Sequence, residues 1–319
     1  MSGLLENPSR LGALCALIAV TLFAANDSTI KFLSSDYALH EVVLFRSLIG
    51  LIVASVIIFP FAGGWQVLRT RRLSLHICRG MLVVFANILF FLGLAALPLA
   101  DAVAIFFVAP LLITIFSVVF LGEKVGPRRW VAVFLGFAGV LIVQRPGTDA
   151  FQVASILPVL AACCYAGLHM MTRYIGKTES AATMTVYIQL TFIVVCVLFG
   201  LTVGDGRFAE QENASLAFLF RAWVWPEAQH WWLLALIGVA TGLGGFFISQ
   251  AYRVAEAAVV APFEYLALPI SIVAGYAIFG EVPDGATFLG IALILGAGLF
   301  IIWREAQADE VVDVPRARR

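Results

Sequence analysis

The chain alternates between long apolar stretches and short polar segments. A helix needs about 20 mostly apolar residues to cross the hydrocarbon core of a bilayer. Ten such stretches occur, and glycine, proline and charged residues separate them. They lie near 11–33, 41–62, 76–97, 101–121, 128–145, 151–173, 182–203, 231–252, 257–279 and 285–303. The pattern predicts an all-α integral membrane protein with ten transmembrane helices.

Composition strengthens this prediction. Of the 319 residues, 62% are hydrophobic and 13% are charged, whereas soluble domains are about 25% charged. The formal net charge is zero, so nothing favours a nucleic-acid partner, and we expect the lipid bilayer as the surroundings. The five cysteines fall in or beside apolar stretches without metal-ligand spacing. We therefore expect no metal site and no cofactor.

The basic residues indicate the orientation of the chain, because Lys and Arg accumulate in cytoplasmic loops. With the N-terminus inside, both termini are cytoplasmic, and 15 of the 20 basic residues lie on that side. They are Arg10, Arg69, Arg71, Arg72, Arg79, Lys124, Arg128, Arg129, Arg173, Lys177, Arg253, Arg304, Arg316, Arg318 and Arg319. The longest loop, about 204–230, is then extracytoplasmic, and its tryptophan-rich apolar part suits a membrane-anchored segment on the bilayer surface.

Two parts of the chain carry the same features in the same order. A mid-span proline, Pro110 or Pro269, is followed 11–13 residues later by a Gly-Glu pair, which ends in Glu123 or Glu281. Small residues stand nine and sixteen positions after each glutamate: Ala132 and Gly139 in one part, Gly290 and Ala297 in the other. We interpret this as an internal repeat.

The repeat divides the chain into a first half of five spans, 1–145, a second half of five spans, 146–303, and a cytoplasmic tail, 304–319. Because five is odd, the second half must enter the membrane in the opposite orientation. Glu281 accordingly has no basic neighbour in the sequence, whereas Glu123 has several. Two inverted five-helix repeats with a binding site between them are typical of secondary transporters that work by alternating access.

These motifs resemble the EamA domain of the drug/metabolite transporter (DMT) superfamily. The resemblance rests on the F-L-G-E and F-G-E pairs, the A-P and L-P prolines and the repeated small residues, and it covers about 12–145 and 153–303. It implies an EamA-type ten-helix fold with a central cavity, in a bacterial inner membrane. It also implies that the fifth and tenth helices pack at the periphery, where a homodimer contact would form.

Within the superfamily, the segments AANDSTIKFL and FRSL are similar to the branch that holds riboflavin and S-adenosylmethionine permeases. The resemblance therefore implies a small-molecule substrate, with uptake of a vitamin such as riboflavin placed first. The alternatives are export of amino acids or other small metabolites, or a permease for an S-adenosylmethionine-like solute. The sequence has no HExxH and no P-loop, and its four histidines are scattered, so we expect no enzyme and no catalytic residue.

Three charged residues lie toward the predicted outer end of the first two spans. Each costs about 2.5–3.5 kcal/mol to insert, so each needs a partner or a function. Asp27 and Lys31 share one helical face, and Arg46 lies in the next span. Asp27 either pairs with Lys31 or pairs with Arg46. Either such a pair locks two helices while Lys31 reaches toward water, or these charges form a rim that recognises substrate.

Glu264 is the sharpest candidate, because it stands between Pro262 and Pro269 in the ninth span. Prolines free backbone carbonyls and kink a helix, which membrane proteins tolerate where the backbone faces protein or a cavity. Two interpretations are open. Glu264 contacts the substrate or carries a coupling proton, or it is a neutral carboxyl that packs between helices. Five uncharged or neutral polar residues in spans complete the candidates: Asn87, Tyr165, His169, Gln250 and Tyr265.

Acidic residues beside helix starts have a structural interpretation. A carboxylate there accepts hydrogen bonds from free N–H groups and interacts favourably with the helix dipole. We expect this role for Glu123 and Glu281, each at the start of the helix that follows it, and for Asp101 and Glu256.

Overall fold

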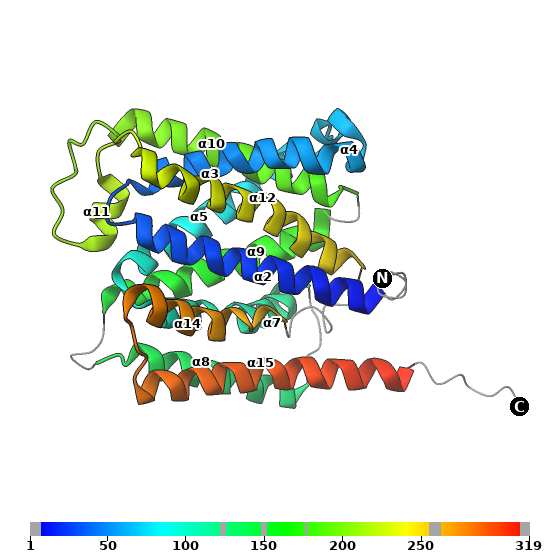
Figure 1. Ribbon diagram of the computed structural model, residues 1–319. Coiled ribbons are helices and arrows are strands. Elements are labelled where there is room, and N and C mark those ends of the chain that lie inside the picture. The colour runs from blue at the N-terminus through cyan, green and yellow to red at the C-terminus, as the bar shows by residue number, and fades with distance from the viewer. Residues whose placement is uncertain (1–7, 122–125, 148–151, 176–177, 255–262, 313–319) are drawn as a thin grey trace, which may run out of the picture.

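The computed structural model describes residues 8–121, 126–147, 152–175, 178–254 and 263–312, and these residues form helices joined by turns, with no strand among them (Figure 1). Six of the helices are long and apolar enough to cross a membrane, and four shorter apolar helices accompany them. The prediction of an all-α membrane protein is confirmed over these ranges. Glu123 and Glu256 lie outside them.

The helices follow the apolar stretches of the sequence. The long ones are α2 (Pro8–Leu33), α3 (Leu39–Val53), α5 (Leu73–Ala96), α9 (Ile156–Ile175), α10 (Ala181–Val203) and α12 (Trp231–Val254). A π-helical turn, η1 (Ala54–Ile58), and α4 (Phe59–Ala62) continue α3. The remaining helices are α6 (Leu99–Phe106), α7 (Ala109–Leu121), α8 (Pro127–Gln144), α11 (Ala214–Phe220), α14 (Ala267–Phe279) and α15 (Gly285–Val312), with 3-10 turns η2 (Gly64–Leu68), η3 (Val153–Ser155) and η4 (Ala228–His230).

The two mid-span prolines each follow a break in a helix. The first break separates α6 from α7 at Phe107 and Val108, just before Pro110. The second lies at Tyr265 and Leu266, just before α14 and Pro269. Proline has no N–H to donate to the carbonyl four residues earlier, so the Tyr265 carbonyl instead accepts from the N–H of Leu268 at 3.1 Å. The kink expected in the ninth span is thus present beside Pro269, and the break before Pro110 is a further one that was not predicted.

Helices α8 and α15 pack against each other along one edge of the bundle (Figure 1). A Cβ on Gly139 would lie 2.8 Å from the Gly290 carbonyl oxygen, so these two glycines allow the backbones to touch. An ion pair between Arg145 and Asp284 joins the end of α8 to the start of α15, which makes the pair antiparallel. The small residues of the repeat therefore form the contact between these helices.

Two substitutions on α15 test this contact. We expect Gly290→Ala to lower the stability of the purified protein by about 1–3 kcal/mol, the usual cost of overpacking, because the new Cβ would meet Val143 Cγ2 at 2.5 Å. Gly296→Ala is the matched control, because nothing lies within 4 Å of its Cβ position. Thermal unfolding in detergent measures both. Equal melting temperatures for the two variants would contradict the close contact.

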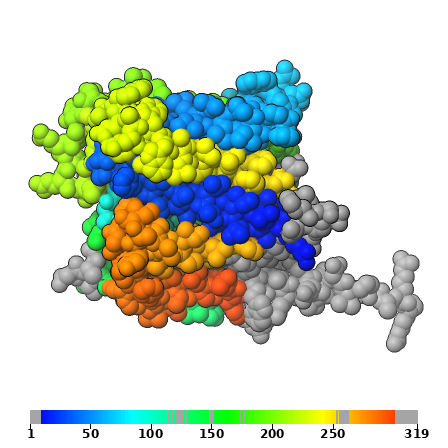
Figure 2. All heavy atoms as spheres, viewed as in Figure 1, coloured from blue at the N-terminus to red at the C-terminus, as the bar shows by residue number. Residues whose placement is uncertain are grey.

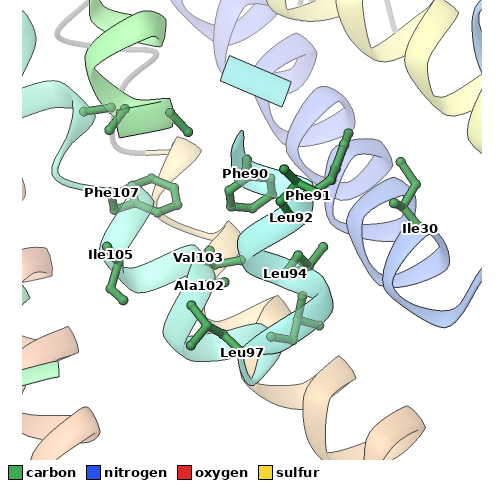
Figure 3. Close-up of a cluster of buried hydrophobic side chains, with 14 of the residues drawn as sticks. Ile30, Phe90, Phe91, Leu92, Leu94, Leu97, Ala102, Val103, Ile105 and Phe107 are labelled. Atoms are coloured by element: carbon green, nitrogen blue, oxygen red, sulfur yellow. The ribbon is translucent and has the colours of Figure 1, made fainter. Parts of the chain in front are cut away.

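The core contains the α5–α6 turn packed against α2. Figure 3 shows Phe91 and Leu94, near the end of α5, on the side that faces Ile30 of α2, and all three are buried. On the face in Figure 2, α2 itself lies between α12 and α14. Large apolar side chains such as Phe61 and Leu201 are exposed around the bundle. Such a surface fits lipid rather than water.

Candidate functional site: polar groups inside the helix bundle

Lys31 joins three segments at the end of the bundle where α11 lies, which we call the α11 end. Its Nζ lies 2.8 Å from Glu281 Oε1, and it also donates to the Leu97 carbonyl. Glu281 Oε2 accepts from the N–H of Leu99, the first residue of α6, at 2.8 Å. One ion pair therefore ties α2, the α5–α6 turn and the segment after α14 together.

This arrangement corrects three expectations. Lys31 pairs with Glu281 and not with Asp27, and its side chain is only 11% exposed rather than extended toward water. Glu281 has a basic partner after all, one that lies far away in the sequence. Its carboxylate caps α6 and not the following helix α15. That helix is capped by Asp284, which accepts from the N–H of Thr287 at 2.9 Å.

Asp284 belongs to the same end and lies outside the helices. Hydrogen bonds from Arg145 and from the Thr287 N–H hold the pKa of Asp284 well below its usual range, so it stays ionised at physiological pH. Asp101 lies in the first turn of α6, as expected, where a negative charge is favourable.

The segment around α11 covers this end of the bundle. Phe218 is 1% exposed, and Ser215 Oγ donates to the Leu92 carbonyl of α5 at 2.6 Å. Arg221 donates to the Ser34 carbonyl at 2.8 Å. Figure 1 shows this part of the chain at the left end of the bundle. The segment is thus packed onto α5 and the α2–α3 turn.

Arg46 is enclosed between helices, with 2% of its surface exposed. Its two terminal nitrogens lie 3.3 and 3.4 Å from Asn87 Oδ1 of α5. The Cζ atom lies 4.9 Å from the ring centroid of Phe192 and 5.5 Å from that of Phe91, which are cation–π distances. These residues come from α3, α5 and α10. Helix α2 also contributes, because the charge of Asp27 acts on Arg46.

Asp27 makes contact with Asn26 instead of with either predicted cation. Its Oδ1 accepts from Asn26 Nδ2 at 2.9 Å, and Asn26 Oδ1 accepts from Thr241 of α12 at 3.2 Å. Of the described residues, neither Lys31 nor Arg46 lies within 4.0 Å of its carboxylate. The predicted pairing of Asp27 with Lys31 is wrong, and its relation to Arg46 is electrostatic attraction without contact.

The second group of candidates surrounds the two helix breaks. The Phe107 and Tyr265 rings, one from each break, are 5.2 Å apart, and the Tyr265 hydroxyl lies against Gly298 of α15. The ring centroids of Phe106 and Tyr165 of α9 are 5.2 Å apart, and those of Tyr165 and His169 are 4.4 Å apart. Both pairs of rings meet edge to face. The two breaks and α9 therefore meet.

Glu264 belongs to this second group. It immediately precedes the break at Tyr265, and its charge acts on both Tyr165 and Tyr265. Seven of the nine candidates fall into two groups. The first group contains Arg46, Asn87 and Asp27. The second contains Glu264, Tyr165, His169 and Tyr265. Lys31 lies at the α11 end. Gln250 on α12 makes no side-chain hydrogen bond to another described residue and joins neither group.

A third polar group, at the opposite end of the bundle, was missed by the sequence analysis. Arg79, which was counted as a loop cation, is buried on α5 and donates to Thr172 at 2.9 Å and to the Met184 carbonyl at 3.1 Å. His76 is buried one turn earlier, 3.6 Å from Glu179. Their three-residue spacing on one helix face was the available signal. In the described part of the chain, no group of three residues is arranged to hold a metal ion.

Comparison with known proteins places these features in a family. The EamA-like transporter family matches residues 10–145. The riboflavin transporter of Vibrio cholerae is 34% identical over 295 residues, covering 91% of this chain and 92% of that one. The chain belongs to the EamA-like transporter family. It is thus a multi-pass membrane transporter for a small molecule.

Other relatives carry different names. The S-adenosylmethionine uptake transporter of Rickettsia felis is 32% identical and covers 92% of both chains. The pseudopaline exporter CntI of Pseudomonas aeruginosa is 27% identical and covers 90% of this chain and 94% of its own. A solved crystal structure, titled only as that of a protein, matches the fold with a TM-score of 0.63 at 19% identity, over 92% of this chain and 98% of that one. These EamA relatives include both uptake and export proteins.

Proposed function

We propose that this EamA-family protein is a secondary transporter of the bacterial inner membrane that takes up a vitamin such as riboflavin by alternating access. The observation that carries the proposal is the 34% identity with a riboflavin transporter over 91% of the chain. The enclosed groups around Arg46 and Glu264 fit it, because charged side chains within a membrane are costly and mark substrate or ion pathways.

We place ten spans in two inverted halves, 1–145 and 146–303, followed by the tail 304–319. The packing of the first helix of each half supports this, because the contacts of α2 and of α9 correspond when the halves are exchanged. Helix α2 packs on α12 and α14, whereas α9 packs on α5 and α7. The spacing of Asp27 and Lys31 on α2 also recurs as His169 and Arg173 on α9.

Both termini are placed in the cytoplasm, so the α11 end faces outward. Contacts at this end support a form closed to the outside: the Lys31–Glu281 ion pair joins elements of both halves, and α11 covers the turn between α5 and α6. The substrate would then bind between the halves, near the breaks at Phe107 and Tyr265. Rocking of one half against the other would break the outer contacts and open the path.

Two other substrates have support from relatives. Uptake of an S-adenosylmethionine-like solute is favoured by the relative with 32% identity, and export of a metabolite by the relative with 27% identity. Riboflavin ranks first because its named transporter is the more similar and because the surroundings of Arg46 are aromatic.

Uptake of labelled riboflavin by a bacterium that cannot make it tests the proposal. Cells that produce the protein are expected to show saturable uptake, which unlabelled riboflavin suppresses and unlabelled S-adenosylmethionine or amino acids do not. Immunodetection in the membrane fraction controls for production. If cells with the protein in their membrane take up no more riboflavin than cells without it, the vitamin assignment is wrong, and efflux assays become the next step.

A further inference from the structure

Arg46 has more hydrogen-bond donors than the surrounding protein has acceptors. Its guanidinium offers five N–H groups in a planar fork. Two nitrogens share a single acceptor atom, Asn87 Oδ1, at the long distances of 3.3 and 3.4 Å. The third nitrogen, Nε, is buried without any hydrogen-bond partner, although the side chain as a whole is only 2% exposed.

No carboxylate of a described residue completes this set. Asp27 attracts Arg46 from beyond ion-pair distance and uses one oxygen to accept from Asn26. Enclosing a cation without a contacting anion is costly, and buried donors without partners are rare in native proteins. A bound molecule that brings acceptors to the fork would remove this deficit.

The neighbours of Arg46 restrict what such a molecule can be. Phe91 and Phe192 are buried and lie within 5.5 Å of the guanidinium carbon from two different helices. Both rings face the guanidinium, so a molecule that reaches the fork lies among aromatic side chains, which pack well against flat rings. A guanidinium fork matches two adjacent acceptors. Together they fit a planar ring with two neighbouring acceptors on one edge, such as a carbonyl oxygen beside a ring nitrogen.

We propose that Arg46 is the residue that determines specificity, by binding the acceptor edge of a planar pteridinedione-type ring such as that of a flavin. Asn87 Oδ1 occupies part of the fork when no substrate is bound, and the substrate displaces it. This inference rests on the proposed transport function and narrows it to one part of the substrate. It separates flat rings with two adjacent acceptors from adenine, whose exocyclic amine is a donor.

The decisive variant is Asn87→Asp, which gives Arg46 a permanent carboxylate to compete with the substrate. We expect it to raise the KM for riboflavin uptake by about tenfold or more, since charge-assisted pairs are roughly twice as strong as neutral ones, while the protein melts at the same or a higher temperature. Asn213→Asp is the matched control. It adds the same charge at the start of α11, where an aspartate can accept from Ser215 and Leu216 as the asparagine does.

Competition by flavin analogues shows which edge of the flavin ring binds Arg46. In the wild type, either 1-deazariboflavin or 5-deazariboflavin, each lacking one ring acceptor, is expected to compete about tenfold less well than riboflavin, because the fork loses a partner. Arg46→Lys, which keeps the charge but lacks the fork, is expected to abolish this preference. Unchanged KM in Asn87→Asp, or equal competition by all three flavins in the wild type, would overturn the inference while leaving riboflavin transport intact.

A binding measurement separates this inference from the proposed function. If the wild type takes up no riboflavin, the thermal shifts caused by riboflavin, lumichrome and xanthine are compared between purified wild type and Asn87→Asp. Suppose that one of these molecules raises the melting temperature of the wild type but not that of Asn87→Asp. Arg46 then binds the acceptor edge of a planar ring other than the one proposed as the transported substrate. No shift in either protein overturns the site together with the riboflavin assignment.

Discussion

The Glu264→Gln variant is expected to reach the membrane in normal amounts and to transport substrate at least about tenfold more slowly. Losing a charged hydrogen-bond partner costs about 1.5–3 kcal/mol, and each 1.4 kcal/mol is a factor of ten in rate. Glu264 is the carboxylate at the break before Tyr265, and its charge acts on the Tyr165 and Tyr265 hydroxyl groups.

The position of Glu264 explains why the effect should be on transport rather than on folding. The break before Pro269 meets the break before Pro110 through the Tyr265 and Phe107 rings. Glutamine has almost the same shape as glutamate, so it preserves packing while it removes the charge and the ability to hold a proton. Interrupted helices at the contact between halves are the usual substrate and ion sites of transporters.

Initial uptake rates, normalised to the amount of protein in the membrane, measure this effect. Glu212→Gln is the matched control, because Glu212 is exposed in the loop between α10 and α11. We expect the control to transport like the wild type. Unchanged uptake by Glu264→Gln would remove Glu264 from the mechanism.

Loss of the Lys31–Glu281 ion pair is expected to open the α11 end. Breaking a buried pair costs about 3–5 kcal/mol; Glu281 is 26% exposed, so we expect a smaller value here. A few kcal/mol is enough to shift a two-state equilibrium from mostly closed to mostly open. Lys31→Gln should therefore populate the outward-open form, because it removes the charge that ties α2 to Glu281.

Labelling of Cys196 detects this opening. Cys196 is buried on α10, and it is close enough to Arg46 for the two to interact electrostatically. In a background in which the other four cysteines are replaced, we expect an impermeant maleimide added from outside to label Cys196 several times faster in Lys31→Gln than in the wild type. Lys31→Arg, which keeps the charge, should label slowly. Equal labelling in all three proteins would show that the pair does not hold this end closed.

The sequence was sufficient for features that depend on local chemistry. Apolar stretches located the helices, Pro269 located the break in the ninth span, and the small residues Gly139 and Gly290 belong to a real helix contact. Each of these follows from a property of the residue itself or from its periodicity along one helix.

The sequence was insufficient where a charge had a choice of partners. Asp27 was given two possible partners, Lys31 and Arg46. Lys31 instead pairs with Glu281, which only the packing of α2 beside α14 brings within reach. Arg79 was counted as a loop cation because it follows Arg71 and Arg72, but it is buried on α5. Partner choice between helices depends on their rotation and depth in the bundle, and hydropathy alone contains neither.

Transport by the purified protein shows whether the chain itself moves riboflavin across a bilayer. Proteoliposomes containing the full chain and empty liposomes are incubated with radiolabelled riboflavin, and the amount inside is followed over time. We expect accumulation that requires the protein and saturates with riboflavin concentration, and an initial rate well below the KM that falls about tenfold or more with Asn87→Asp. Equal riboflavin content in liposomes with and without the correctly inserted protein would contradict the proposed riboflavin transport.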